Sequence, residues 1–215
     1  MSDSDTRSRV LLADDHKIVA EGIRSLLEPE FNLIGTVENG RELLKSCEAC
    51  CPDVIVLDIS MPLLNGIEAA RQLKKMGCSA KIIFLTMHPD AVYGRRAFEA
   101  GASGYVLKHS APSELVHAIR QVLKGRVYVT PLIAREVLQS LMERPTQDDE
   151  LSLTSRQREV LQLLAEGLSA KEVATVLNIS PRTVEFHKYQ MMERLNLSSS
   201  AELLQFAIKH GVVSV

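Results

Sequence analysis

The sequence lacks the hydrophobic run of about 20 residues that a helix needs to cross a bilayer. Its first nine residues are polar and contain no apolar segment of the kind that a secretion signal carries, so we expect a cytoplasmic protein that does not enter a membrane. With 8 Pro and 11 Gly in 215 residues, it also lacks the composition of a fibrous or low-complexity chain. A globular protein with one large domain or two modest ones remains.

Cysteine is scarce, and its arrangement argues against a zinc site. Cys47, Cys50 and Cys51 fall within five residues of one expected helix, and Cys78 stands apart. No histidine pair or second cysteine pair has zinc-ligand spacing. We interpret the thiols as small packing residues, with redox or metal sensing as the alternative.

An excess of charge of one sign is missing too. The 25 Lys and Arg nearly balance the 27 Asp and Glu, which gives a formal net charge of −2. This balance neither suggests nor excludes nucleic acid as a partner. A surface that binds nucleic acid would have to be a local basic patch.

The sequence does contain five short apolar segments that alternate with segments of helical spacing. The apolar segments are 9–13, 33–37, 54–57, 82–85 and 104–107, and Ser113 is expected to cap the last helix. Branched apolar runs without polar alternation indicate parallel strands that helices cover on both faces. The alternation therefore predicts a doubly wound α/β fold with a five-stranded parallel sheet.

Four of these segments end in polar residues, namely Asp14 and Asp15, Asp58, Thr86, and Lys108. Singly, an Asp after a strand is usually a helix cap and a Lys is usually a solvated surface charge. Together they are more specific, because parallel strands bring them to one edge of the sheet, where ligands bind. Three crowded carboxylates repel one another unless a cation lies among them, and their hard oxygen atoms suit Mg²⁺.

Residues 9–124 resemble the receiver domain of two-component response regulators. The motifs that carry the resemblance are Asp14-Asp15, Asp58 with Met61-Pro62 and Gly66, Thr86, Tyr105 and Lys108. The resemblance implies strand order 2-1-3-4-5 and makes Asp58 the acceptor of a phosphoryl group from a sensor histidine kinase. It implies that Asp15, Asp58 and the backbone carbonyl of Ser60 hold Mg²⁺, and that Asp14 acts largely through water.

The resemblance also implies a switch. The Thr86 hydroxyl and the Lys108 ammonium would be drawn toward the phosphoryl group, and Tyr105 would turn inward and repack the surface beside it. The alternative for Tyr105 is a half-buried strand aromatic. The chain departs from many receivers at His109, where proline is common, which leaves that peptide geometry open. Ser60 and His88 occupy positions that tune phosphoryl hydrolysis in this family, although His88 also fits a solvated loop residue.

Residues 126–150 are interpreted as a linker. Residues 133–141 have the spacing of one amphipathic helix, and the polar stretch 144–150, which contains a proline, is typical of an exposed tether. The chain is therefore divided into 9–125, 126–150 and 151–215.

Residues 151–215 are expected to be all helical, with helices over 155–166, 170–177, 181–195 and 201–210. Thr154, Ser169 and Ser199 each stand three positions before a Gln or Glu, the pattern of a capping box. Ser180 precedes Pro181, the residue best tolerated at a first helical position. Only residues 178–180 separate the second and third helices, and so short a turn indicates a helix-turn-helix.

The C-terminal domain resembles the LuxR-type DNA-binding domain of the NarL/FixJ class over residues 151–213. The motifs are residues 153–161, 166–169 and 171–174, and Thr183-Val184 with His187. In this arrangement the third helix enters the major groove. The candidate DNA contacts are Glu185, Phe186, Tyr189 and Arg182 toward base edges, and Lys171, Arg182, Thr183, Lys188 and Arg194 toward the backbone. Val184, Met191 and Leu195 are expected to pack inward.

The domain departs from its family at Glu185, where a basic residue is common. An acid there repels phosphates but accepts from the cytosine amino group. Seven Lys or Arg stand against six Glu in the domain, which implies few phosphate contacts and weak binding by one copy. We therefore expect a homodimer on double-stranded DNA, with RNA polymerase as a further candidate partner.

Three functions are weighed. The first is a transcription regulator controlled by phosphorylation at Asp58, which is not an enzyme. The second is a phosphatase with an aspartate nucleophile, but those enzymes usually carry a second Asp where this chain has Ser60. The third is a DNA-binding protein whose receiver is never phosphorylated, against which the complete acid set argues.

Overall fold

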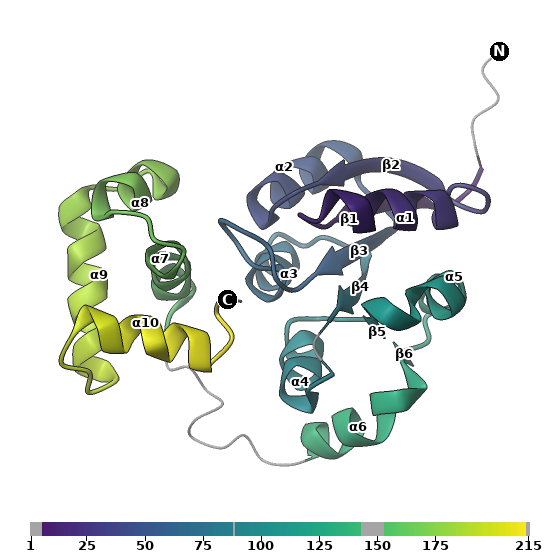
Figure 1. The fold of residues 1–215 in the computed structure, drawn as a ribbon. Helices are drawn as coiled ribbons and strands as arrows, with labels where there is room; N and C mark the ends of the chain where they lie inside the picture. The colour runs from purple at the N-terminus through teal and green to yellow at the C-terminus, as the bar shows by residue number, and fades with distance from the viewer. Residues whose placement is uncertain (1–5, 88, 143–152, 214–215) are drawn as a thin grey trace.

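A parallel sheet of six strands organises the N-terminal half of the protein (Figure 1). The computed structural model describes residues 6–87, 89–142 and 153–213. The sheet order is β2-β1-β3-β4-β5-β6, which confirms the predicted order of the first five strands. The strands are β1 (Arg9–Ala13), β2 (Asn32–Val37), β3 (Val54–Asp58), β4 (Lys81–Thr86), β5 (Gly104–Leu107) and β6 (Tyr128–Val129).

Helices cover both faces of this sheet. Their bounds are α1 (Lys17–Leu27), α2 (Gly40–Cys50), α3 (Gly66–Lys75), α4 (Ala91–Glu99) and α5 (Ala111–Leu123). Apolar residues of α1 and α5 pack with one face of the strands, and those of α2, α3 and α4 pack with the other. Strand β3 is buried along its whole length, as its four branched residues before Asp58 predict.

The start of α5 differs from the prediction. The helix begins at Ala111 with Ser110 as its N-cap residue, and the Ser113 hydroxyl inside the first turn donates to the Ser110 carbonyl at 3.1 Å. A 3₁₀ turn over Lys108–Ser110 leads directly into the helix, so no cap is needed at Ser113. Pro112 in the first turn costs no hydrogen bond. Among the described residues no peptide bond is cis, which settles the geometry at His109 as trans.

Much of the segment expected to be a linker packs on the receiver. Strand β6 pairs with β5, and buried Thr130 accepts from the Leu107 N–H at 3.1 Å and donates to Glu114 at 2.8 Å. A 3₁₀ turn over Pro131–Ile133 and helix α6 (Ala134–Met142) follow, and Ile133 and Val137 are buried in the same cluster as β4 and β5. The expected tether at 144–150 lies outside the described residues, and the boundary at residue 125 stays a prediction.

The C-terminal half is all helical, as predicted. It consists of α7 (Ser155–Ala165), α8 (Ala170–Leu177), α9 (Pro181–Arg194) and α10 (Ser200–Lys209) around one apolar cluster. Capping boxes form at Thr154 and Ser169, but at Ser199 the Glu202 carboxylate accepts from Ser198 instead, so that box is incomplete. Asn178 ends α8 in the left-handed conformation and forms the short turn before α9. No helix in the described parts of the chain is long and apolar enough to cross a membrane.

Candidate functional site

The predicted acidic residues meet at the carboxyl edge of the sheet. Because β1 pairs with β3 in the register Ala13 with Leu57, Asp14 and Asp58 follow at neighbouring positions. Oxygen atoms of Asp14, Asp15 and Asp58 and a nitrogen of His16 all lie within 4.8 Å of one another. Asp14 and Asp58 are buried, Asp15 is half-buried and His16 is exposed.

Lys108 brings a cation to these acids from the end of β5. Its Nζ lies 2.7 Å from Asp58 Oδ2 and 2.8 Å from Asp14 Oδ2. Burial raises the pKa of the Asp58 carboxyl, although Lys108 acts against this rise. Burial acts to lower the pKa of Lys108, but its contacts with Asp58 and Asp14 outweigh that effect and the pKa is raised overall. The ammonium is therefore held in its charged form between two carboxylates.

The residues present fit a hard divalent cation. Carboxylate oxygens from three acids converge, and Mg²⁺ takes oxygen ligands of this kind. One ammonium stands against these carboxylates, so the site has an excess of negative charge that a cation would reduce. The Ser60 N–H donates to the Asp58 carboxylate, which fixes the start of the following loop beside the acids.

Thr86 and Tyr105 lie together on adjacent strands. Thr86 ends β4, and both side chains are fully buried. Their side chains form a hydrogen bond, and burial raises the pKa of the Tyr105 hydroxyl. Tyr105 thus occupies the inward position in this structure, and it is more buried than the half-buried strand aromatic considered as its alternative. It also packs in the cluster that contains Ile133 and Val137.

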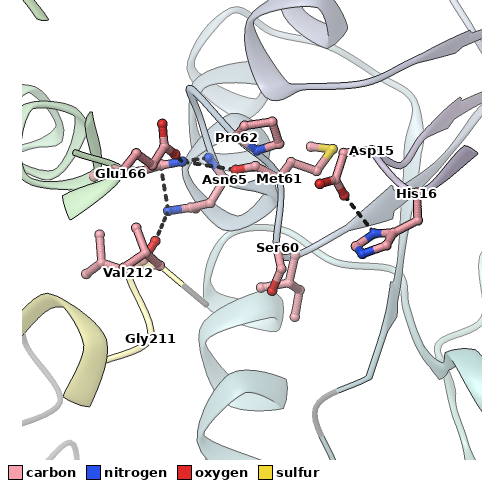
Figure 2. A pocket seen from close by; sticks show the side chains of 12 residues that line it. Asp15, His16, Ser60, Met61, Pro62, Asn65, Glu166, Gly211 and Val212 are labelled. Carbon is pink, nitrogen blue, oxygen red and sulfur yellow. Dashed lines mark hydrogen bonds and ion pairs between the residues drawn. The ribbon is translucent and has the colours of Figure 1, made fainter. Parts of the chain in front are cut away.

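Two groups of site residues were missed by the sequence reasoning. His16 follows the acid pair directly, and its Nδ1 lies 2.9 Å from Asp15 Oδ1, so the run Asp-Asp-His was an available signal. Gln162 and Glu166 of α7 line the same cleft as Asp15 and Ser60, and Figure 2 shows Glu166 across the cleft from Asp15 and Ser60. No local pattern could have predicted them, because they come from the other domain. His88, expected near this edge, lies outside the described residues.

The predicted DNA contacts lie on α9 and the start of α8. Phe186 and Tyr189 are 56% and 63% exposed, and Arg182, Lys171 and Arg194 are exposed as well. Val184 and Met191 are fully buried and Leu195 packs partly on the core, so the helix has the predicted inner and outer sides.

Two of these residues already interact with neighbouring side chains of the same domain. Lys188 pairs with Glu185 at 3.3 Å, and Thr183 shares a short contact with the N-cap hydroxyl of Ser180 at 2.8 Å. The pair of Lys188 and Glu185 is nearly neutral as a unit. The basic groups that remain on this face are therefore few.

A receiver domain with this acid cluster, joined to a helix-turn-helix domain, defines the response regulators. The chain belongs to this family. The model of the response regulator receiver domain matches residues 10–120. The model described as bacterial regulatory proteins, luxR family, matches residues 151–207. Because this family consists of regulators rather than phosphatases, the enzyme alternative is set aside.

Individual relatives cover almost the whole chain. The response regulator UvrY of Escherichia coli K12 is 36% identical over 206 residues, 94% of each chain. The putative transcription regulator BvgA of Bordetella pertussis is 33% identical over 95% of this chain and 99% of its own length. The structure of RcsB from Salmonella enterica serovar Typhimurium, bound to a promoter in the presence of a phosphomimetic, is 30% identical, covers 95% of this chain and 100% of that one, and has a TM-score of 0.63.

Proposed function

We propose that this protein is a transcription regulator in which phosphorylation of Asp58 controls DNA binding. The observation that carries the proposal is the arrangement of Asp58, Asp14 and Lys108, with the Lys108 ammonium within 2.8 Å of both acids. Phosphoryl transfer needs positioning and charge neutralisation more than covalent assistance, and this site supplies both. The donor is a phosphohistidine of a sensor kinase, and the protein acts in the cytoplasm.

Each residue of the acidic site has a separate role in phosphoryl transfer. An oxygen of Asp58 attacks the phosphorus in line, the donor's P–N bond breaks, and its electron pair leaves with the imidazole. Lys108 neutralises charge on the transferred group. Asp15, Asp58 and the Ser60 carbonyl would hold Mg²⁺, with Asp14 acting through water. When bound, this ion would neutralise charge on the phosphoryl oxygens.

Thr86 and Tyr105 connect the site to the rest of the receiver. The aspartyl phosphate carries about two negative charges, which attract the Thr86 hydroxyl and the Lys108 ammonium. Because Tyr105 is hydrogen-bonded to Thr86, movement of Thr86 changes the packing of Tyr105. Ile133 and Val137 pack in the same cluster and pass the change to α6.

The DNA-binding half is proposed to act through α9 in the major groove of double-stranded DNA. Glu185, Phe186 and Tyr189 would face bases, Arg182 would reach bases or backbone, and Lys171, Thr183, Lys188 and Arg194 would contact the backbone. The solved RcsB structures include one of two dimers bound to two DNAs. We propose a homodimer here as well, since one copy presents few basic groups. RNA polymerase is a candidate partner at the promoter.

The test is to incubate the protein with phosphoramidate and Mg²⁺ and to measure intact mass. We expect one added phosphoryl group that is stable in acid and labile in base, and none on Asp58→Asn. The same samples are then tested for binding to fragments of the source genome. Equal DNA affinity for untreated protein, treated protein and Asp58→Asn would favour the alternative of a receiver that is never phosphorylated.

A further inference from the structure

Three of the four cysteines line one small cleft of about 200 Å³ at the edge of the sheet where the strands begin. Cys47 lies in the last turn of α2, Cys51 directly follows that helix, and Cys78 follows α3. Cys51 comes shortly before β3 and Cys78 shortly before β4, and these two strands are parallel. The cleft is therefore at the opposite end of the strands from Asp58, and the thiols are not part of the acidic site.

Cys47 and Cys78 are in direct contact inside this cleft. Cys47 is 5% exposed, and Cys78 packs against the apolar cluster that contains it. Burial, followed by the nearby Cys78 thiol and the hydrogen bond between the two, raises the pKa of Cys47 to about 12. Cys47 thus keeps its proton and is the donor of this hydrogen bond. Two sulfur atoms in such contact have only a short way to move to form an S–S bond of about 2 Å.

The backbone at Cys78 is anchored, while its side chain borders the cleft. Gly77, with φ +76°, ends α3, and the Cys78 N–H donates to the Leu73 carbonyl at 3.0 Å. The Cys78 side chain itself is half-buried and lines the cleft. We therefore expect the two sulfur atoms to approach by rotation of the Cys78 side chain, with α3 in place.

Neither packing nor metal binding accounts for this group of thiols. A packing role explains buried Cys47, because a free cysteine behaves as a small apolar residue, but it does not explain exposed Cys51 or half-buried Cys50 and Cys78 beside it. Among the residues that the structure describes, the acidic site is the one group of three or more ligating side chains close enough to share a metal ion. The cysteines are thus arranged for a bond between two sulfur atoms.

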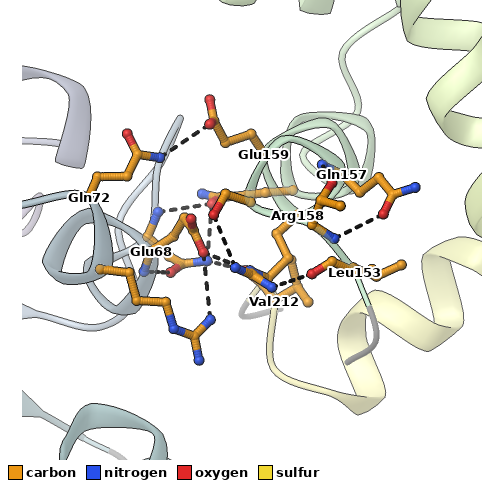
Figure 3. Close-up of polar contacts among 12 residues, drawn as sticks. Glu68, Gln72, Leu153, Gln157, Arg158, Glu159 and Val212 are labelled. Carbon is orange, nitrogen blue, oxygen red and sulfur yellow. Dashed lines mark hydrogen bonds and ion pairs between the residues drawn. The ribbon is translucent and has the colours of Figure 1, made fainter. Parts of the chain in front are cut away.

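The cleft is accessible to a small oxidant. Hydrogen peroxide is little larger than water, whose share of liquid volume is about 30 Å³, so it fits the cleft. All the lining residues belong to the receiver, and Cys51 at the rim is exposed. The contacts between α3 and α7, such as that of Glu68 with Arg158 (Figure 3), involve residues that do not line the cleft. The arrangement of the domains therefore leaves it open.

We propose that Cys47 and Cys78 are a site of reversible oxidation, at which a peroxide converts the two thiols into a disulfide. The Cys78 thiolate attacks the O–O bond of hydrogen peroxide, an S–O bond forms, and the hydroxide that leaves takes up the Cys78 proton as water. The Cys47 sulfur then attacks the Cys78 sulfenic acid. The S–S bond forms, the S–O bond breaks, and the oxygen leaves as water with the Cys47 proton.

The sulfur atoms thus give two electrons to one peroxide, and the products are one disulfide and two molecules of water. A dithiol reductant reverses the step by thiol–disulfide exchange. Intracellular disulfides are usually transient and redox-sensing, so in a protein that we propose to act in the cytoplasm this bond is a reversible signal. It also closes residues 47–78 into a ring, which restricts the unfolded chain and stabilises the receiver.

The first test maps the bond in the full-length protein. Reduced protein is treated with hydrogen peroxide and digested with trypsin and a Glu-specific protease, which separates Cys47 on peptide 46–48 from Cys50 and Cys51. Cys78 falls on peptide 76–81. We expect these two peptides to be linked, with a mass lower than their sum by two hydrogen atoms, and to separate after treatment with dithiothreitol.

Two variants isolate the pair. The double substitution Cys50→Ser with Cys51→Ser is the matched control, because it leaves Cys47 and Cys78 as the only thiols of the chain. This control should form the disulfide at the wild-type rate. Cys78→Ser, at a half-buried position outside the helices, should fold normally and leave peptide 46–48 unlinked.

Thermal unfolding gives a second readout of the same bond. We expect peroxide to raise the unfolding midpoint of wild type and of the control by about 5 °C or more, and dithiothreitol to remove the rise. The midpoint of Cys78→Ser should not rise. A midpoint that stays the same in wild type although the peptides are linked would overturn the stabilising effect of the bond.

Three results of the mapping would overturn the site itself. They are a bond from Cys78 to Cys50 or Cys51, a bond between two chains, and oxygen added to the thiols without any disulfide. A control variant that forms the bond tenfold more slowly than wild type would also overturn it, since Cys50 or Cys51 would then take part. All of these measurements are independent of phosphorylation at Asp58.

Discussion

At the scale of single residues, Lys108 determines the electrostatics of the acid cluster. It is the ammonium that lies within 2.8 Å of both buried acids, and its own side chain is 7% exposed. Buried charges without partners are costly, so Asp14 and Asp58 depend on this cation or on one that replaces it.

Removal of this ammonium should therefore destabilise the fold. We expect Lys108→Ala to lower the free energy of unfolding by about 3 kcal/mol without Mg²⁺, because breaking a buried pair leaves a carboxylate uncompensated. Millimolar Mg²⁺ should restore part of the loss. Urea denaturation with and without Mg²⁺ measures both effects. Lys17→Ala, which removes an ammonium that is 80% exposed, should change stability by less than about 0.5 kcal/mol.

The thiols differ in reactivity for a related reason. Burial raises the pKa of Cys47 to about 12, while Cys51 is exposed at the end of α2. The thiolate is the nucleophile, so at pH 8 iodoacetamide should modify Cys51 well before Cys47. Peptide mapping after timed quenching measures the order. Modification of Cys47 first would show that its environment is more open than this packing implies.

Single residues of the site were largely predictable. Asp58 and Thr86 end their strands, and Asp14 and Lys108 directly follow theirs. Because parallel strands end at one edge of the sheet, the convergence of these residues follows from topology. His16 was missed because its neighbour Asp15 already explained the local pattern. The cap at Ser113 was wrong because a cap preference cannot distinguish the first residue of a helix from one in its first turn.

At the scale of elements, α6 behaves as part of the receiver. It packs across α4 where Gly94 lets it approach: a Cβ on Gly94 would lie 2.7 Å from Val137 Cγ2. Val137 is fully buried there, in the cluster that holds Tyr105. The contact thus links the switch aromatic to the segment that leads to the second domain.

A methyl group at this contact should separate the two helices. We expect Gly94→Ala to lower the free energy of unfolding by about 1 to 3 kcal/mol, the usual cost of overpacking. Val137→Ala in the same chain should recover much of it, because the clash is with this side chain. A double-mutant cycle in urea measures the coupling.

Gly22 provides the matched control for that substitution. It also lies inside a helix, but an added Cβ would meet nothing within 4 Å. Gly22→Ala should raise stability by about 0.5 to 1 kcal/mol, since alanine favours helix. A loss at Gly22 similar to that at Gly94 would mean that the effect does not come from Val137.

The elements with strong periodicity were predicted to within a few residues, and β6 was not predicted. A strand of two residues carries no periodic signal, and Tyr128–Val129 is recognisable only by its pairing with β5. The amphipathic spacing of residues 133–141 predicted the helix but could not say which surface its apolar side covers.

At the scale of the whole molecule, the near balance of acidic and basic residues in the DNA-binding domain limits the electrostatic contribution to DNA binding. Since Lys188 is paired with Glu185, few phosphate contacts remain for one copy. The logarithm of the binding constant should therefore fall with the logarithm of salt concentration with a shallow slope, about 0.9 for each phosphate contact.

Removal of one contact should be visible in that slope. We expect Arg182→Ala to reduce it by about 1 for each bound copy, hence by about 2 for a dimer. Fluorescence anisotropy on a selected genomic fragment at several salt concentrations measures it. Lys209→Ala on α10 should leave the slope unchanged, and an equal reduction there would mean that the effect is one of net charge alone.

The arrangement of the two domains could not be derived from the sequence. The pairs that join them, Arg158 with Glu68 and Gln162 with Asn65, are separated by about 90 residues or more. Each residue also fits its own helix by local rules, so nothing in the pattern marks it as part of an interface.

The exposed outer side of α9 bears on the basal transcription of the genes that such a regulator controls. Phe186 and Tyr189 are exposed in the domain arrangement of this structure, so we expect the unphosphorylated protein in this arrangement to keep its DNA-reading helix accessible. A gene under its control would then have a measurable baseline of transcription set by protein abundance. Stimulation would then increase this basal transcription rather than switch transcription on from zero. Overproduction of the unstimulated protein would mimic the stimulus.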